Sequence, residues 1–257
     1  MSDRLPMYPL DAVVFPGARR LVRVTDDRYR ALVHHLLRRS DPTERLLGTV
    51  AIREGYELGE HGAQSLFRVG VRLQLTAARE RPDGSFDIEV LGRDRLQLDR
   101  LLTTGDFPVG EITPLPEQRS VVHPEVVERA RATYLAYRVV VADIVAGRGG
   151  LLTDGFEPEF TEDDDLYEPD GGEPGAFAVL DDDTGHDPLP RDPDYLAWAI
   201  AAGTALPLGE RQQLLEATDA QERLALATDL VRGELMAMNV IASLPATEVA
   251  RTRWSPN

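Results

Sequence analysis

The chain has 257 residues, no cysteine and a net charge of −16 at pH 7, and all of its 28 basic residues are arginine. Without cysteine there is no disulfide, thiolate nucleophile or cysteine-bound metal. Without lysine there is no Walker-A phosphate loop, Schiff base or Ser-Lys dyad. No apolar run approaches the roughly 20 residues that span a bilayer, and Met1–Pro9 lack a signal-peptide pattern, so we expect a cytoplasmic protein with no membrane partner.

The first part of the chain predicts three strands and one helix. Leu5–Leu10 predicts a short strand, which its two prolines limit to an edge or a bulged position. Arg20–Val24 alternates as a second strand, and Thr25 can cap a helix over Asp26–Arg38. Leu46–Arg53 then predicts a buried strand.

The clearest strand pattern follows. Leu66–Leu75 alternates apolar and polar residues, as a half-buried antiparallel strand does. Pro82–Gly84 predicts a turn, because proline presets one backbone dihedral and glycine supplies a positive φ. Phe86–Val90 is the expected return strand of a hairpin; we expect Gly92 to end it and Arg95–Leu98 to begin another strand.

A closing strand is predicted at Val109–Leu115. Five or more short antiparallel strands with one intervening helix favour a small barrel. We expect its core to include five apolar side chains: Val69, Val71, Phe86, Ile88 and Val90.

Beyond the strands the apolar period changes to 3.6, which predicts a long helix over His123–Gly147. A second helix is expected over Asp192–Gly203, with aspartate as its cap and proline in its first turn. A third is expected over Gly209–Ala217, and Asp219 with Glu222 forms a capping-box pattern for the last one. The chain is therefore predicted to be α+β, with an antiparallel β-barrel followed by a helical bundle.

An acidic insertion interrupts the helical half at about residues 148–191. Sixteen of the 44 acidic residues lie between Thr153 and Asp194 with one arginine, which leaves 28 acidic residues and 27 arginines elsewhere. Glu162–Asp165 and Asp181–Asp183 could bind a hard cation, but the second run misses the EF-hand pattern. We favour a solvated loop that is separable from the fold. Its aromatic residues could dock on a partner or pack on the chain's own body.

Five landmarks carry a family resemblance: the opening Leu5–Leu10, then Val13–Gly17, Arg68–Gly70, Pro82–Gly84, and Gly92 followed by Arg95. In this order and spacing they resemble the N-terminal substrate-recognition domain of Lon proteases. Glu210–Glu216 and Asp219–Leu224 are similar to that family's helix pair. The resemblance covers roughly residues 4–117 and 191–245. It implies a PUA-like barrel over 1–120 and a helical bundle over 121–257, and the acidic insertion departs from it.

Catalysis is not expected. A Lon protease needs an ATPase lysine and a dyad lysine, so this chain resembles the recognition part of Lon without its ATPase and protease parts. Its five histidines are scattered, and it has neither a Gly-x-Ser-x-Gly elbow nor a His-Glu-x-x-His pair. We therefore predict no catalytic, cofactor or metal site.

The resemblance implies a non-catalytic module that recognises extended or unfolded protein segments, as an adaptor in protein quality control with a protease or chaperone partner. A barrel edge or the barrel–bundle groove would accept such a segment, with Tyr56, Leu58 and Phe67 as candidate contacts. Two alternatives stay open. An arginine face not neutralised by acids would favour an RNA-binding PUA-like protein, although nucleic acid is disfavoured because acids balance the arginines. A deep pocket with converging Asp, Glu and His would favour a carboxylate-dependent hydrolase.

Overall fold

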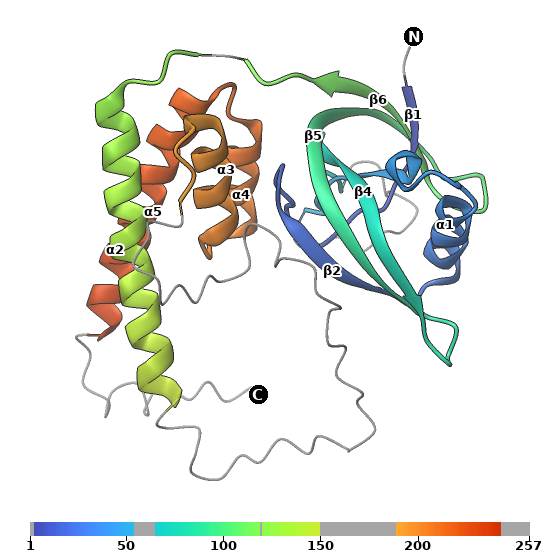
Figure 1. Cartoon of the computed structure of the whole chain (residues 1–257), viewed down its shortest axis with the longest axis horizontal. Helices are drawn as coiled ribbons and strands as arrows, with labels where there is room; N and C mark the ends of the chain where they lie inside the picture. Colours follow the sequence, from blue (N-terminus) through green and yellow to red (C-terminus); the bar gives the residue numbers. More distant parts are fainter. Residues whose placement is uncertain (1–2, 54–64, 119, 150–188, 243–257) are drawn as a thin grey trace.

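The computed structural model describes residues 3–53, 65–118, 120–149 and 189–242. Within these residues the strands are β1 (Asp3–Pro6), β2 (Arg19–Val24), β3 (Leu46–Thr49), β4 (Val69–Glu80), β5 (Phe86–Leu102) and β6 (Val109–Leu115). The helices are α1 (Asp27–Leu37), the short 3-10 helix η1 (Pro42–Glu44), α2 (Pro124–Gly149), α3 (Pro193–Gly203), α4 (Leu208–Glu216) and α5 (Ala220–Ala242). The predicted α+β class, a barrel followed by helices, is confirmed (Figure 1).

The long strand β5 is the centre of the barrel. The sheet runs in the order β1-β6-β5-β4-β3, and every pairing between its named strands is antiparallel. β4 pairs along one edge of β5, whereas β2 and β6 share the other edge, β2 beside residues 86–91 and β6 beside residues 95–102. The segment after β1 closes the barrel against β3 and the residues after it, since Tyr8 N donates to Gly48 O and Leu10 N to Val50 O.

Gly92 does not end a strand, contrary to the prediction, because β5 continues through it. The turn that precedes β2 packs against this position: Gly17 N donates to Gly92 O at 2.9 Å. A Cβ at residue 92 would collide with the carbonyl oxygen of Phe15. Glycine within a strand commonly marks a place where another backbone approaches closely, and that is its role here.

Gly92→Ala is therefore expected to lower the free energy of unfolding by about 1–3 kcal/mol, the usual cost of overpacking. The control is Gly233→Ala on α5, where an added Cβ meets no atom within 4 Å. Alanine has the higher helix propensity, so the control should gain about 1 kcal/mol or slightly less. Chemical denaturation of both variants measures this. A Gly92→Ala protein as stable as the parent would contradict the close approach of the Phe15 backbone.

Two details of the N-terminal region also differ from the predictions. The cap of α1 is Asp26 rather than Thr25, because the Asp26 carboxylate accepts a hydrogen bond from Arg28 N at 2.8 Å. The strand predicted over Leu5–Leu10 ends at Pro6, and the residues after it make isolated parallel bridges instead. Local sequence therefore identified the helix and the strand but misplaced the capping residue of one and the end of the other.

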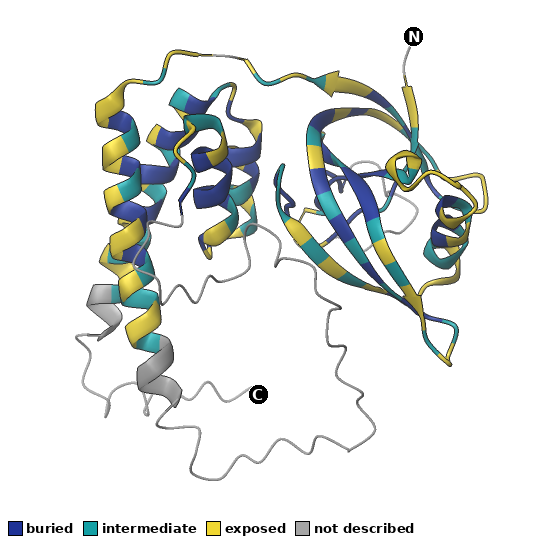
Figure 2. Ribbon diagram, in the orientation of Figure 1, coloured by how far each residue is buried: buried dark blue, intermediate teal, exposed yellow. Residues whose placement is uncertain are grey.

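The predicted barrel core is confirmed, since Val71, Phe86, Ile88 and Val90 are each at most 2% exposed. Figure 2 shows buried residues recurring along the long strands of the barrel. Val69 is half-buried and packs against the same cluster. This cluster continues into the helices, where the ring of Phe15 lies 6.0 Å from that of Trp198. The division proposed after residue 120 falls between β6 and α2, but apolar contacts cross it.

Helices α3 and α5 begin where their predicted capping residues stand. The Asp192 carboxylate accepts from Asp194 N at 2.9 Å to start α3. At the start of α5, Asp219 accepts from Glu222 N at 2.9 Å, and Glu222 accepts in turn from Thr218 N at 2.7 Å. None of the helices in the described part of the chain is both long and apolar enough to cross a membrane.

Candidate functional site

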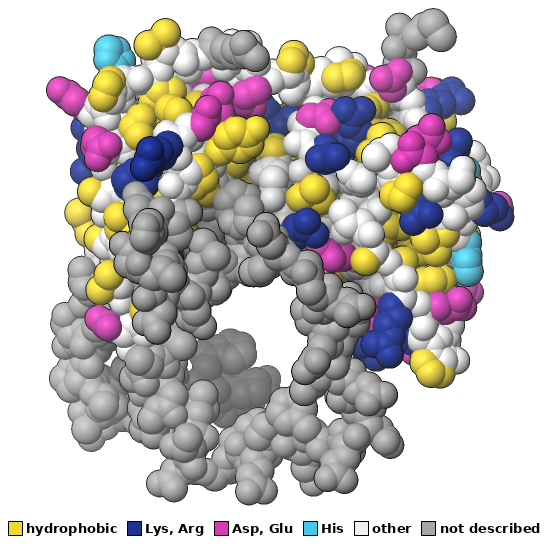
Figure 3. All heavy atoms as spheres, in the orientation of Figure 1, with side chains coloured by type: hydrophobic (Ala, Val, Ile, Leu, Met, Phe, Trp, Pro, Cys, Tyr) yellow, Lys and Arg dark blue, Asp and Glu magenta, His cyan; other side chains and the backbone are white. Residues whose placement is uncertain are grey.

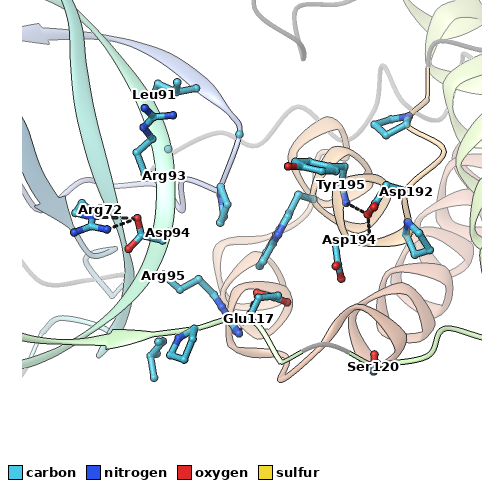
Figure 4. A pocket seen from close by; sticks show the side chains of 18 of the residues that line it. Arg72, Leu91, Arg93, Asp94, Arg95, Glu117, Ser120, Asp192, Asp194 and Tyr195 are labelled. Atoms are coloured by element: carbon cyan, nitrogen blue, oxygen red, sulfur yellow. Dashed lines mark hydrogen bonds and ion pairs between the residues drawn. The ribbon is translucent and has the colours of Figure 1, made fainter. Parts of the chain in front are cut away.

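A cleft of about 1290 Å³ lies between the barrel and the helices. Its barrel wall comes from β5 around Leu91–Arg95, from the residues at the end of β6, and from Arg72 of β4. Its helical wall is the N-terminal end of α3 with the proline-rich residues before it. We call this hollow the interdomain cleft (Figure 4).

Charges on the barrel wall are largely paired. Arg72 donates from Nε and Nη2 to Asp94 Oδ1, at 3.0 and 2.7 Å. Arg93 is exposed and forms no ion pair with any described residue; it lies beside Leu91 in Figure 4, as residues two apart on a strand do. Among the described residues, the wall therefore offers the Arg93 guanidinium, without an ion-pair partner, next to an apolar side chain.

The helical wall carries an aromatic ring. Tyr195 stands in the first turn of α3, reaches toward the barrel in Figure 4, and is 66% exposed. Asp192, which fixes this turn, is occupied as the helix cap. An exposed tyrosine on a rigid helix presents a large apolar face and a hydroxyl at little cost in side-chain entropy.

Two buried arginines contact one carboxylate at the floor of the cleft. Arg95 Nη2 lies 3.2 Å from Glu117 Oε2, and Arg223 Nη2 lies 2.7 Å from Glu117 Oε1. The side chain of Arg223 is fully buried and that of Arg95 is 6% exposed. Since Arg95 comes from β5 and Arg223 from α5, the Arg95–Glu117–Arg223 cluster joins the barrel to the bundle.

The same two arginines hold the C-terminal end of α4. Arg95 Nη1 donates to Leu215 O at 3.0 Å and to Ala217 O at 2.7 Å. Arg223 donates from Nε to Leu214 O at 3.1 Å and from Nη2 to Ala217 O at 2.9 Å. The last carbonyls of a helix have no partners within it and carry a partial negative charge, so guanidinium groups suit this end.

Trp198 covers the cluster. The guanidinium carbon of Arg223 lies 3.4 Å from the centre of the indole ring, and that of Arg95 lies 5.8 Å from it. Burial lowers the pKa of Arg223, and the Glu117 carboxylate opposes that shift. An arginine stays charged in proteins because its ordinary pKa is very high. Trp198, Arg95 and Glu117 all line the interdomain cleft, whose floor is therefore a packed, hydrogen-bonded unit.

Of the three predicted contacts only Phe67 belongs to the described residues, and it is not among those that line this cleft. Phe67 is half-buried, packs against the main core, and lies with its ring centre 5.1 Å from the Arg53 guanidinium. Tyr56 and Leu58 lie outside the described residues. A peptide-binding role for these three stays a prediction.

Sequence reasoning missed the residues that build the cleft. One signal was available: Arg223 falls on the inward stripe of α5, three residues after Ala220 and four before Ala227, and both alanines are fully buried. A charged residue on a core stripe requires partners. Its partners come from distant parts of the sequence, which the pattern does not reveal.

In the described residues, no three His, Cys, Asp or Glu side chains lie close enough together to hold a metal ion. His34 packs against Phe86 and His35 against Phe107, each with ring centres 5.0 Å apart. Burial lowers the pKa of His35, and Arg38 and Arg39 add to that effect. These two histidines are packed against aromatic rings.

A family model described as the ATP-dependent protease La (LON) substrate-binding domain matches residues 4–233. A Lon protease of Anaeromyxobacter dehalogenans is 25% identical over 253 residues, which are 97% of this chain but 26% of that protein. A Lon protease of Parabacteroides distasonis is 27% identical over 121 residues, which are 46% of this chain and 14% of that protein. The chain thus spans about a quarter or less of these relatives.

Two solved structures share the fold. A Lon N-terminal domain protein from Xanthomonas campestris superposes with a TM-score of 0.53 at 19% identity, covering 95% of this chain and 99% of that one. The N-terminal domain of a Mycobacterium avium complex Lon protease gives 0.52 at 18% identity, covering 90% and 98%. The family match extends over most of the sequence, so the chain belongs to the family of Lon substrate-binding domains.

Proposed function

We propose that this chain is a non-catalytic recognition module that binds extended or unfolded segments of other proteins in the interdomain cleft. The observation that carries the proposal is an open cleft of about 1290 Å³ with an exposed aromatic ring on a rigid wall. Pockets for small molecules usually measure about 300–1,000 Å³, so this hollow suits a longer ligand.

The lining of the cleft also suits a polypeptide. Tyrosine and tryptophan are enriched among the residues that contribute most to binding at protein interfaces. Here Tyr195 and Trp198 lie on the same helix, and both line the cleft. Leu91, Leu115 and four prolines add apolar surface, while Arg93 can meet a carboxylate. An extended chain offers both backbone groups and alternating side chains to such a surface.

A hydrolase receives less support. Three of the four carboxylates among the described residues that line the cleft have structural partners: Asp94 pairs with Arg72, Glu117 with two arginines, and Asp192 caps α3. The fourth, Asp194, acts on the buried Arg223, whose pKa burial lowers and this carboxylate raises. No histidine is among the described residues that line it. A general acid or base needs a free side chain aimed at the substrate.

RNA binding receives less support for a related reason. Barrel arginines are paired with carboxylates, among them Arg20 with Asp11, Arg72 with Asp94, and Arg81 with Asp87. On the face drawn in Figure 3, arginine and acidic side chains are interspersed. Phosphate binding draws its affinity from an unneutralised positive surface.

We further propose that the module acts as an adaptor in protein quality control, delivering bound segments to a protease or chaperone in the cytoplasm. The support is the family membership and the likeness to Lon proteases, whose remaining length this chain does not span. The absence of lysine from the chain supports recognition without ATP hydrolysis or Ser-Lys peptide cleavage.

Tyr195→Ala tests the cleft. The client is reduced and carboxymethylated α-lactalbumin, an unfolded chain, with the folded protein for comparison. We expect the variant to bind the unfolded client at least about fivefold more weakly, because truncating an interface tyrosine commonly costs over about 1 kcal/mol. The control is Val139→Ala on α2, at a side chain that is 62% exposed, and it should bind as the parent does. Equal binding by all three proteins, with equal melting temperatures, would refute the cleft as the binding site.

A further inference from the structure

The barrel has an unpaired strand edge. Within the described residues β2 pairs only with β5, and its other edge makes no backbone hydrogen bond. Figure 2 shows β2 alternating between exposed and more buried residues. Leu21, in the middle of this strand, is 79% exposed. Most natural edge strands are covered, twisted away or shortened, because a free edge can pair with another chain.

The register identifies the backbone groups that are free. Gly92 N donates to Ala18 O at 2.8 Å, one step before the pair Arg19–Leu91. Hydrogen-bonded and non-hydrogen-bonded pairs alternate along an antiparallel ladder. It follows that Arg20, Val22 and Val24 bond to β5, whereas Arg19, Leu21 and Arg23 direct their N–H and C=O groups away from it.

A groove runs along this free edge. It has a volume of about 350 Å³ and lies between residues 20–23 of β2 and the segment Tyr8–Asp11. In the opposite wall, Tyr8 N and Leu10 N are bonded to Gly48 O and Val50 O and Pro9 has no N–H, so these three residues offer the free edge no backbone donor. We call this groove, with the free edge of β2, the edge groove.

The charges of the edge groove select its occupant. Arg19 and Arg23 share the face of β2 that carries Leu21, and Arg20 lies on the other face. Arg19 donates to Glu89 at 2.5 Å, whereas Arg23 lies 3.7 Å from Asp83 and donates no hydrogen bond to a described residue. The donors of Arg23 remain available for a carboxylate, with which arginine forms strong, directional pairs.

We propose that the edge groove binds an extended polypeptide segment by strand addition, and that the segment carries an acidic residue two positions from an apolar one. The apolar residue lies beside Leu21 and the acidic residue beside Arg23, because cross-strand neighbours meet at this spacing. The backbone groups of Arg19, Leu21 and Arg23 supply the hydrogen bonds. This site is separate from the interdomain cleft and does not depend on it.

Three labelled peptides and two variants test the proposal by fluorescence anisotropy. The probe is an acetylated, amidated Thr-Glu-Thr-Val-Thr-Glu-Thr peptide. A second peptide has lysine in place of both glutamates, and a third is N-methylated at alternate residues to block backbone pairing. We expect Leu21→Glu to weaken binding of the probe roughly tenfold, by losing the apolar contact and adding like charges. Val139→Glu is the control, since that side chain is also largely exposed but lies on α2.

Amide hydrogen exchange then reads the pairing directly. With the probe bound, the amides of Arg19, Leu21 and Arg23 should exchange more slowly, while those of Arg20 and Val22, already bonded to β5, should change little. Tyr195→Ala should bind the probe as the parent does, which separates this site from the cleft. Equal binding of the glutamate, lysine and N-methylated peptides, or equal loss in both glutamate variants, would overturn the proposal.

Two other occupants would also overturn it. Binding of the probe only after residues 155–189 are replaced by a Gly/Ser linker would give the edge groove to the chain's own acidic insertion. A dimer of the parent that Leu21→Glu abolishes in sedimentation would give it to a second copy.

Discussion

Replacing Arg223 with alanine is expected to lower the free energy of unfolding by about 3–5 kcal/mol, the cost of breaking a buried charge pair by removing one partner. The substitution leaves Glu117 without its 2.7 Å partner and removes the donors to Leu214 O and Ala217 O. It also opens a cavity against the ring of Trp198, which the guanidinium now covers at 3.4 Å.

Two other substitutions sharpen this test. Arg232→Ala removes an exposed arginine from the same helix and should change stability by no more than about 0.5 kcal/mol. Arg223→Lys keeps the charge but loses the planar fork, so its stability should fall between those of the parent and the alanine variant. Urea denaturation measures all three. Equal stability of Arg223→Ala and Arg232→Ala would show that the cluster does not hold the barrel to the bundle.

Val71→Asp is expected to cost several kcal/mol, because it places an unpaired carboxyl in the barrel core. Val71 is 0% exposed on β4. Burial raises the pKa of such a carboxyl in the folded state, so the folded protein binds its proton more tightly than the unfolded chain does. The loss of stability should therefore be largest at neutral pH and smaller at about pH 5.

The control for this substitution lies on the same strand. Ala77 is exposed on β4, and Ala77→Asp should melt within a few degrees of the parent, since surface changes are usually worth under about 0.5 kcal/mol. Thermal melts at the two pH values compare the proteins. If Val71→Asp and Ala77→Asp had the same melting temperature at both pH values, the assignment of Val71 to the inward face of β4 would be wrong.

The strands and the core of the barrel were predictable because alternation reports one buried face directly, as Val71 and Phe86 show. The continuity of β5 was not. A glycine that ends a strand and a glycine that admits a neighbouring backbone look alike in sequence, and only the contact of Gly92 with the Phe15 segment separates them. The end of a predicted strand is thus the weakest part of the pattern.

The starts of α3 and α5 followed from local chemistry, since Asp192 and Asp219 cap the turns that immediately follow them. A groove between barrel and bundle was expected from the family resemblance, but the residues that line the interdomain cleft did not follow, because it is made where β5, β6 and α3 meet. Glu117 lies between β6 and α2 with no pattern of its own, and its role depends on two arginines that only the tertiary fold brings together. Local periodicity carries no information about such a meeting.

Site-specific photo-crosslinking tests the central claim, that extended protein segments bind in the interdomain cleft. A benzophenone-bearing phenylalanine analogue replaces Tyr195 in one protein and Val139 in another, and each is irradiated with unfolded or folded α-lactalbumin. We expect a crosslink from position 195 to the unfolded chain, little to the folded one, and little from position 139 to either. Equal yields from positions 195 and 139, or no preference for the unfolded chain, would contradict the claim.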